Sequence, residues 1–312
     1  MSIRLHAPAI LTAALLLPAA LAAQRGPTPE PLVRAEGIAS LAEHTWAIPS
    51  HNVPAVPNVG IVVGSRATLV IDPGMGRPNG EVVRRAAGTL SRNAEFYVAS
   101  THWHVEHTTG VAAFPPPAKY LNAKVQDAEF VEGAAEQTRS FASRSPLHAE
   151  LLSGAARRPA DIAFDREYLL DLGGVRVRAQ VVGPTHTRGD TVFFVEGDNV
   201  LFAGDVVMNN SFVAAQEVSS LKAWLAAFDL MAAWGPRTIV PAHGEVGSGA
   251  LIGVNRGFML AIQARARELK AQGRSVDEVA ATVQREMQAK HPTFARLNGV
   301  GAAARAAYGE AP

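Results

Sequence analysis

Short apolar runs and helically spaced apolar positions alternate along this chain, and together they predict a mixed fold. Runs rich in β-branched residues and bounded by Gly, Pro or Asp are typical of strands buried on both faces. Such runs predict strands at residues 59–72 (two strands around Gly64-Ser65), 96–100, 168–172, 175–182, 191–196, 200–203 and 238–240.

Other stretches have apolar residues three and four positions apart, which is the spacing of an amphipathic helix. They predict helices at residues 81–90, 125–144, 221–234, 251–272 and 276–289. Ser275, followed by Glu278, has the capping-box pattern of a helix start. The last 20 or so residues are rich in Ala and Gly, and we expect them to be frayed. Strands and helices in two mixed batches predict an α/β (α+β) protein with two packed sheets and helices outside.

Composition narrows the class of protein. The chain has 312 residues, of which 48% are apolar and 18% charged, as expected for a globular protein rather than a disordered one. The net charge is +1 and the sequence has no run of Lys or Arg, so it lacks the basic pattern that is typical of nucleic-acid-binding proteins. We therefore expect a small-molecule substrate. The absence of cysteine excludes disulfides and thiolate metal ligands.

The N-terminus has the pattern of a secretory signal peptide. Arg4 precedes an apolar run at residues 7–21, and Ala20-Leu21-Ala22 has the small-x-small pattern of a cleavage site. The run has about 15 residues, fewer than the roughly 20 that span a bilayer, and Pro8 and Pro18 interrupt it. We therefore expect a periplasmic or secreted protein without a stable membrane anchor after cleavage.

The predicted organisation has four parts. They are a signal peptide (1–22), a flexible lead-in (23–35), a catalytic domain (36–250) with a helical insertion at about 124–163, and a C-terminal helical extension (251–312). The insertion is expected to form a lid or wall over the candidate metal-binding residues described below. The sequence gives no indication of oligomeric state.

Side chains that bind metals follow several predicted strands. The segment Thr101-His102-Trp103-His104-Val105-Glu106-His107 comes directly after the strand at 96–100. His102 and His104 would point the same way in extended backbone and could share one metal ion. Glu106 and His107 come where the chain must turn away, so they are better placed for a second ion.

Three further candidates each occupy a short loop downstream: His186, Asp205 and His243. Each alone would be an ordinary loop or turn residue, and it is their combination with the histidine cluster that indicates a two-metal site. Imidazole and carboxylate ligands without thiolate suit zinc, with iron or manganese as alternatives.

Five ordered motifs over about residues 36–249 resemble the metallo-β-lactamase superfamily. They are Ile71-Asp72-Pro73-Gly74, the HxHxEH cluster, Thr185-His186-Thr187-Arg188-Gly189-Asp190, Phe202-Ala203-Gly204-Asp205 and Pro241-Ala242-His243-Gly244. The resemblance implies an αββα sandwich with two metal ions at one edge. It implies that His102, His104 and His186 bind the first ion. It implies that Glu106, His107 and His243 bind the second, with Asp205 bridging.

Glu106 departs from the family pattern, which has Asp at this position. The longer side chain could bind a displaced second ion, or it could swing out and leave a weakened or single-metal site. The resemblance places Asp72 and Asp190 where aspartates orient ligands through hydrogen bonds, and turn-capping is the alternative role for both. As catalytic groups, Glu106 and Asp205 would offset metal charge, and Asp205 could orient the attacking hydroxide.

The expected function is an exported binuclear zinc metallohydrolase that cleaves a small ester, lactone, thioester or amide by attack of metal-bound hydroxide. β-Lactamase activity is the main alternative. Against it, Asp205 stands where thiolate-ligated classes need cysteine, and Met208 stands where they place a lysine that receives the drug carboxylate.

Three other functions stay open. A glyoxalase II role would use Arg256, Arg265, Arg267 and Lys270 for an anionic thiol conjugate, although basic residues at helical spacing more often form a solvated face. A mononuclear iron oxygenase would follow if Glu106 failed to hold a second metal. The third possibility is a non-catalytic metal-binding module. Metal analysis separates the last two of these from a binuclear hydrolase: two zinc ions favour hydrolysis, one iron favours oxygenation, and no metal favours a binding role.

Overall fold

The computed structural model describes residues 29–311. The predicted signal peptide and residues 23–28 of the predicted lead-in lie outside this range. Within it, no helix combines the length and the apolar character that crossing a membrane would require.

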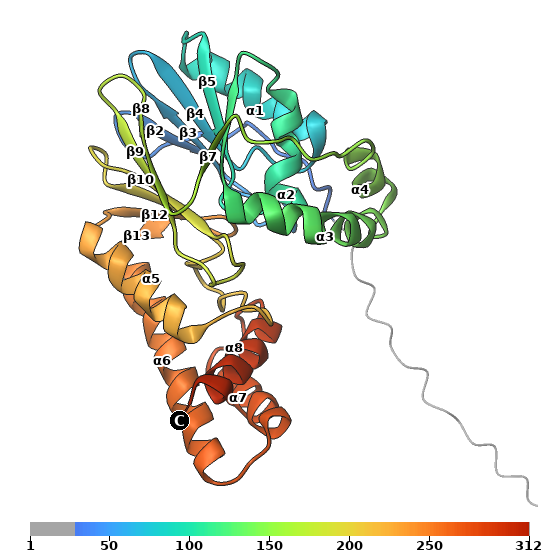
Figure 1. The fold of residues 1–312 in the computed structure, drawn as a ribbon, viewed down its shortest axis with the longest axis vertical. Coiled ribbons are helices and arrows are strands. Elements are labelled where there is room, and N and C mark those ends of the chain that lie inside the picture. The colour runs from blue at the N-terminus through green and yellow to red at the C-terminus, as the bar shows by residue number, and fades with distance from the viewer. Residues whose placement is uncertain (1–28, 312) are drawn as a thin grey trace, which may run out of the picture.

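Two mixed β-sheets form the centre of the molecule (Figure 1). The seven-stranded sheet follows chain order: β1 (Ala39–Ser40), β2 (Thr45–Ile48), β3 (Val59–Val63), β4 (Ala67–Ile71), β5 (Glu95–Ala99), β6 (Lys119–Ala123) and β7 (Ile162–Phe164). The six-stranded sheet has the order β13 (Gly247–Ser248), β12 (Thr238–Pro241), β11 (Val200–Gly204), β10 (Thr191–Val195), β9 (Arg176–Val181) and β8 (Glu167–Asp171). Strands β4 to β7 are parallel to one another, as are β11 and β12.

Helices connect and cover the sheets. They are α1 (Gly76–Leu90), α2 (Val105–Thr108), the 3-10 helix η1 (Thr109–Ala113), α3 (Lys124–Ala142), α4 (Pro146–Leu151), α5 (Leu221–Trp234), α6 (Ala250–Ala271), α7 (Val276–Lys290) and α8 (Leu297–Glu310). In Figure 1, α1 lies beside the first sheet, and α5 and α6 lie below the second. Helices α3 and α4 occupy the predicted insertion between β6 and β7.

Apolar side chains fill the space between the sheets and beneath the helices. Leu69 and Ile71 of β4 share one buried cluster with Phe193 of β10 and Phe202 of β11. A second cluster joins Val83 of α1 to the outer face of the first sheet, and a third joins α5 and α6 to the second sheet. These layers confirm the predicted αββα sandwich.

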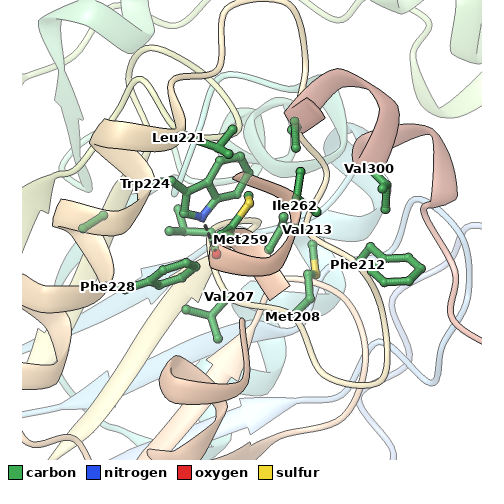
Figure 2. Packing of buried hydrophobic residues seen from close by; sticks show 14 of the residues in the cluster. Val207, Met208, Phe212, Val213, Leu221, Trp224, Phe228, Met259, Ile262 and Val300 are labelled. Atoms are coloured by element: carbon green, nitrogen blue, oxygen red, sulfur yellow. Dashed lines mark hydrogen bonds between the residues drawn. The ribbon is translucent and has the colours of Figure 1, made fainter. Parts of the chain in front are cut away.

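The C-terminal segment differs from the expectation. The last residues form α8 instead of a frayed end, with Ala303, Ala304 and Ala307 fully buried. Small side chains let α8 pack closely against α6 and α7. Figure 2 shows Val300 of α8 in the same cluster as Trp224 of α5, Met259 of α6 and the loop after β11. The C-terminal helices and the second sheet therefore share one core.

Part of the predicted flexible lead-in is packed. The Val33 backbone N–H donates to Asn79 Oδ1 at 2.8 Å, and Asn79 Nδ2 donates to the Pro31 carbonyl at 2.9 Å. Val33 is buried. Burial of this side chain against α1 gives these residues a fixed place that the Pro-rich composition did not indicate.

Candidate metal centre

The candidate ligands come from four connections at one edge of the sandwich. The first four follow β5: His102 and His104 precede α2, while Glu106 and His107 lie within it. His186 lies between β9 and β10, Asp205 follows β11, and His243 follows β12. The chain turns into α2 directly after His104, which separates the first histidine pair from Glu106 and His107.

His102, His104 and His186 form a first cluster. Their donor atoms all lie within 4.8 Å of one another, and all three residues are buried. His104 Nδ1 lies 2.9 Å from His102 Nε2 and 3.2 Å from His186 Nε2. Because zinc–nitrogen bonds are about 2.1 Å long, nitrogens this close could all bind one ion.

Glu106, His107 and His243 form a second cluster, again with donor atoms within 4.8 Å of one another. Glu106 Oε2 and His107 Nε2 are buried, and neither has a hydrogen-bond partner among residues 29–311. Buried polar atoms are rarely left unpaired, and their isolation here is what a cation site requires. Glu106 thus lies with the second cluster and does not swing out of it.

Asp205 lies between the two clusters. Its Oδ2 is 3.6 Å from His186 Nε2, and its Oδ1 is 3.9 Å from His243 Nε2. Oδ1 is buried and has no hydrogen-bond partner in the described part of the chain. One oxygen therefore faces each cluster, which is the arrangement of a bridging carboxylate.

Hydrogen bonds orient several imidazoles by their Nδ1 atoms. The acceptors are Asp72 Oδ2 for His107 (3.0 Å), the Ala214 carbonyl for His186 (2.6 Å) and the Val56 carbonyl for His243 (2.9 Å). A proton held on Nδ1 leaves Nε2 free as a metal ligand. In all three residues Nε2 is the nitrogen that faces a cluster.

The two predicted supporting aspartates have different places. Asp72 accepts hydrogen bonds from the Thr101 N–H (2.7 Å) and hydroxyl (2.8 Å) as well as contacting His107. Asp190 accepts from the Thr187 N–H (2.8 Å) and hydroxyl (2.7 Å) and from the Thr185 hydroxyl. Asp72 thus contacts a candidate ligand directly, while Asp190 holds the loop on either side of His186.

Burial and neighbouring charges set the protonation of the site. Burial lowers the pKa of His102 and His104 well below the usual range, and it lowers the pKa of His243 to about 3. Burial also opposes charge on His107, but the Asp72 and Glu106 carboxylates outweigh it and raise the pKa of His107 to about 9.

The carboxylates respond in opposite directions. Burial raises the pKa of Glu106. Burial acts in the same direction on Asp205, but the Arg296 guanidinium and the nearby histidines outweigh it and hold the pKa of Asp205 well below its usual range. Neutral His102, His104 and His243 and an anionic Asp205 are the forms that bind metal ions, whereas His107 would lose its proton on binding. With that proton released, the residues present fit a pair of divalent cations.

Arg296 is a site residue that the sequence did not reveal. Its Nη1 donates to Asp205 Oδ2 at 3.1 Å, across 91 positions of sequence. It lies just before α8, in the segment expected to be frayed, and no motif surrounds it. The basic residues considered for a glyoxalase II role lie elsewhere: Arg256 pairs with Asp229, Arg265 pairs with Glu286 and Glu268, and Lys270 donates to the Tyr308 and Ala311 carbonyls.

A cleft of about 560 Å³ opens onto the second cluster. Glu106 and His243 form its metal-side wall, and the insertion contributes Phe141 from the end of α3 and Arg144 from the turn after it. Asn209, Asn210, Ser211 and Arg296 are also among its lining residues. The insertion and the C-terminal extension both contribute to the wall of the site.

Comparisons with known proteins identify the family of the chain. A family model described as "Metallo-beta-lactamase superfamily" matches residues 53–243. The atrochrysone carboxyl ACP thioesterase of Aspergillus terreus is 29% identical over 61% of this chain and 49% of its own length. The lactamase-like protein nscB of Trichophyton equinum is 28% identical over 61% and 48%. The chain thus spans about half the length of these curated relatives.

Solved structures share the fold. A metallo-beta-lactamase from Pontibacter korlensis has a TM-score of 0.57 at 17% identity, covering 70% of this chain and 96% of that one. The sec-alkylsulfatase Pisa1 from Pseudomonas sp. has a TM-score of 0.63 at 15% identity, covering 87% and 49%. At these identities the likeness concerns the fold alone.

Proposed function

Because this chain belongs to the metallo-beta-lactamase superfamily, we propose that it is a metal-dependent hydrolase that uses two zinc ions to cleave a small ester, lactone, thioester or amide. The proposal rests on the position of Asp205, which directs one oxygen toward each of two clusters of potential metal ligands. Relatives with hydrolase-type names support the same class of activity.

The chain's own residues would hold and balance the charged site. When bound, paired divalent ions supply a water that ionises near neutral pH and stabilise negative charge on the reacting group. Asp205 can accept a hydrogen bond from the attacking water and so orient it. Glu106 and Asp205 offset part of the metal charge. Asp72 keeps His107 in the tautomer that presents Nε2.

Thioesters come first among the candidate substrates. The relative from Aspergillus terreus is named a thioesterase, and the bridging Asp205 is consistent with that branch. β-Lactams come second, because the uncharged and buried Met208 stands where the thiolate-ligated lactamases place a lysine.

The mononuclear iron alternative depends on losing Glu106 from the second cluster. The unpaired Oε2 of Glu106 lies with His107 and His243, which supports two ions over one. The same unpaired donors argue against a site without metal.

Export completes the proposal, and it is supported by the signal pattern at residues 1–22. Protein recovered from the periplasm should begin near Ala23 when its N-terminus is sequenced. An intact Met1 on that protein would rule out cleavage.

A small hydrolysis panel tests the activity, with a thioester, a lactone and nitrocefin as substrates. We expect turnover that is lost after chelation, restored by zinc, and lowered at least about 100-fold in kcat/KM by Asp205→Asn, equivalent to about 2.7 kcal/mol. Asp229→Asn is the matched control, because Asp229 is exposed on α5 and pairs only with Arg256 among the described residues. Turnover that survives both chelation and Asp205→Asn would contradict the proposal.

A further inference from the structure

Arg296 places a guanidinium group between the metal centre and the cleft. Its Nη1 donates to Asp205 Oδ2 at 3.1 Å, its side chain is 30% exposed, and it lines the cleft. A guanidinium carries five N–H donors. This bond to Asp205 is its single side-chain hydrogen bond among residues 29–311. Donors therefore remain for a group that enters the cleft.

The fold holds Arg296 in place at a conformational cost. Its φ of 61° lies in the left-handed region, which residues other than glycine seldom adopt unless the surroundings impose it. The preceding carbonyl of Ala295 accepts from the Phe212 N–H and the Ser211 hydroxyl, both at 3.2 Å. At Gly299 a Cβ would meet the Val213 carbonyl at 2.2 Å. These contacts fix the start of α8 against the loop that follows Asp205.

The charge of the cleft favours an anion. Arg144 also lines it, with its guanidinium carbon 3.5 Å from the centre of the Phe141 ring. The acidic residues of the wall are Glu106, which faces the second cluster, and the exposed Glu245. Two divalent ions would carry more positive charge than Glu106 and Asp205 neutralise, and both arginines add to that excess. A positively charged cleft concentrates anionic substrates.

Building on the hydrolase function above, we propose that Arg296 binds an anionic oxyacid group of the substrate, a carboxylate or a sulfonate. The planar fork of arginine matches two oxygens of such a group. Asp205 is in contact with Arg296 and faces both clusters, so the bound anion lies beside the reacting bond. The substrate class is thus a small ester or thioester with an anionic group a few bonds from the scissile carbonyl.

Equilibrium binding tests this assignment without turnover. Zinc-loaded protein is titrated calorimetrically with succinate, methanesulfonate and neutral succinamide, and the ranking of the first two identifies the anion. Arg296→Gln should weaken binding of the preferred anion about 10- to 100-fold, as expected for a charged hydrogen bond. Arg296→Lys should retain part of the affinity.

Arg305→Gln, within the helix that follows Arg296, is the control. Arg305 pairs with Asp277, is about half exposed and is not among the residues that line the cleft. The Arg305→Gln variant should bind the anion with the same affinity as the unaltered protein. Thermal unfolding should show that each variant is folded. Equal binding by Arg296→Gln and the unaltered protein would overturn the proposal, because metal alone would then hold the anion.

Matched substrates extend the test to specificity. For a succinyl thioester, Arg296→Gln should lower kcat/KM about 10- to 100-fold, while the neutral butyryl thioester changes less than about threefold. Equal losses on both thioesters would overturn the role in specificity. If the unaltered protein cleaves neither thioester but its binding of succinate still depends on Arg296, the proposed thioester hydrolysis is wrong and the proposed anion site is supported.

Discussion

At the scale of single residues, the main difference between this chain and its family is Glu106, which stands where the family pattern has Asp. Its extra methylene does not remove it from the site, because its carboxylate lies with the His107 and His243 imidazoles. It is buried beside Asp205, and its Oε2 is unpaired among the described residues. The second cluster therefore keeps three potential ligands despite the longer side chain.

Removing the charge of Glu106 should weaken the second metal site selectively. We expect Glu106→Gln to lower the affinity for the second zinc while the first zinc, held by His102, His104 and His186, stays bound. Competition with a chromophoric chelator measures both affinities. Glu106→Asp, which keeps the charge, is the control. Equal zinc affinities in Glu106→Gln and the unaltered protein would contradict this role.

His107 should make metal binding depend on pH. Its pKa is raised to about 9, so it carries a proton at pH 7, whereas a metal ligand must be neutral. Zinc binding at pH 7 should release at least one proton, and affinity for the second ion should rise with pH up to about 9. Calorimetry in buffers of different ionisation enthalpy measures the release.

Asp72→Asn provides the control for this effect, since Asp72 is the largest cause that raises the pKa of His107. The variant should release fewer protons at pH 7. Identical proton release by the variant and the unaltered protein would show that another group supplies the proton.

The seven candidate ligands could be found from the sequence because each belongs to a local motif with a recognisable residue type. Arg296 could not. It reaches Asp205 only because α8 folds back onto the loop at residues 211–215, and no local pattern records a contact across 91 positions.

At the scale of elements, the strands predicted most accurately from the sequence are those that are buried along their whole length. Strands β4, β10 and β11 are buried along their whole length and appear as continuous apolar runs. Strand β6 mixes Lys119 and Asn122 with apolar residues, and β7 has three residues, so neither gave a signal. Helix α8 was missed because its buried face consists of Ala and Gly, which resemble a disordered tail in composition.

The close packing of α8 can be tested at two of its glycines. A side chain at Gly299 would meet the Val213 carbonyl, so Gly299→Ala should lower the free energy of unfolding by about 1–3 kcal/mol. Urea denaturation measures this change. Gly309→Ala on the same helix is the control, because nothing lies within 4 Å of its added methyl group, and it should leave stability unchanged or slightly raised.

A loss of stability at Gly299 should also weaken anion binding, because the start of α8 holds Arg296. If both alanine variants unfold at the same urea concentration as the unaltered protein, α8 is not packed as described.

At the scale of the whole molecule, one edge of the sandwich collects parts that are distant in the chain. The loops after β5, β9, β11 and β12 contribute the candidate ligands, the insertion contributes Arg144, and the C-terminal extension contributes Arg296. Alternation of strands and helices was enough to predict the layers. Which residues line the cleft depends on how the loops, the insertion and the C-terminal extension fold. Hydrophobic periodicity and amino-acid composition do not predict this.

Metal should stabilise the entire fold. The candidate ligands follow strands of both sheets and come together only in the folded state, so ions bound there at 100 times their dissociation constant would add about 2.7 kcal/mol per site. Chelation should therefore lower the midpoint of thermal unfolding, and added zinc should restore it. The same midpoint with and without chelator would indicate that no ion is bound in the folded state.

Metal content is the measurement that tests the central claim most directly. Protein purified without added metal is analysed for all transition metals, alongside Asp205→Asn. Two clusters bridged by Asp205 predict about two zinc ions per chain and fewer in the variant. A single iron, or no metal, would contradict the two-metal site and the hydrolytic function that rests on it.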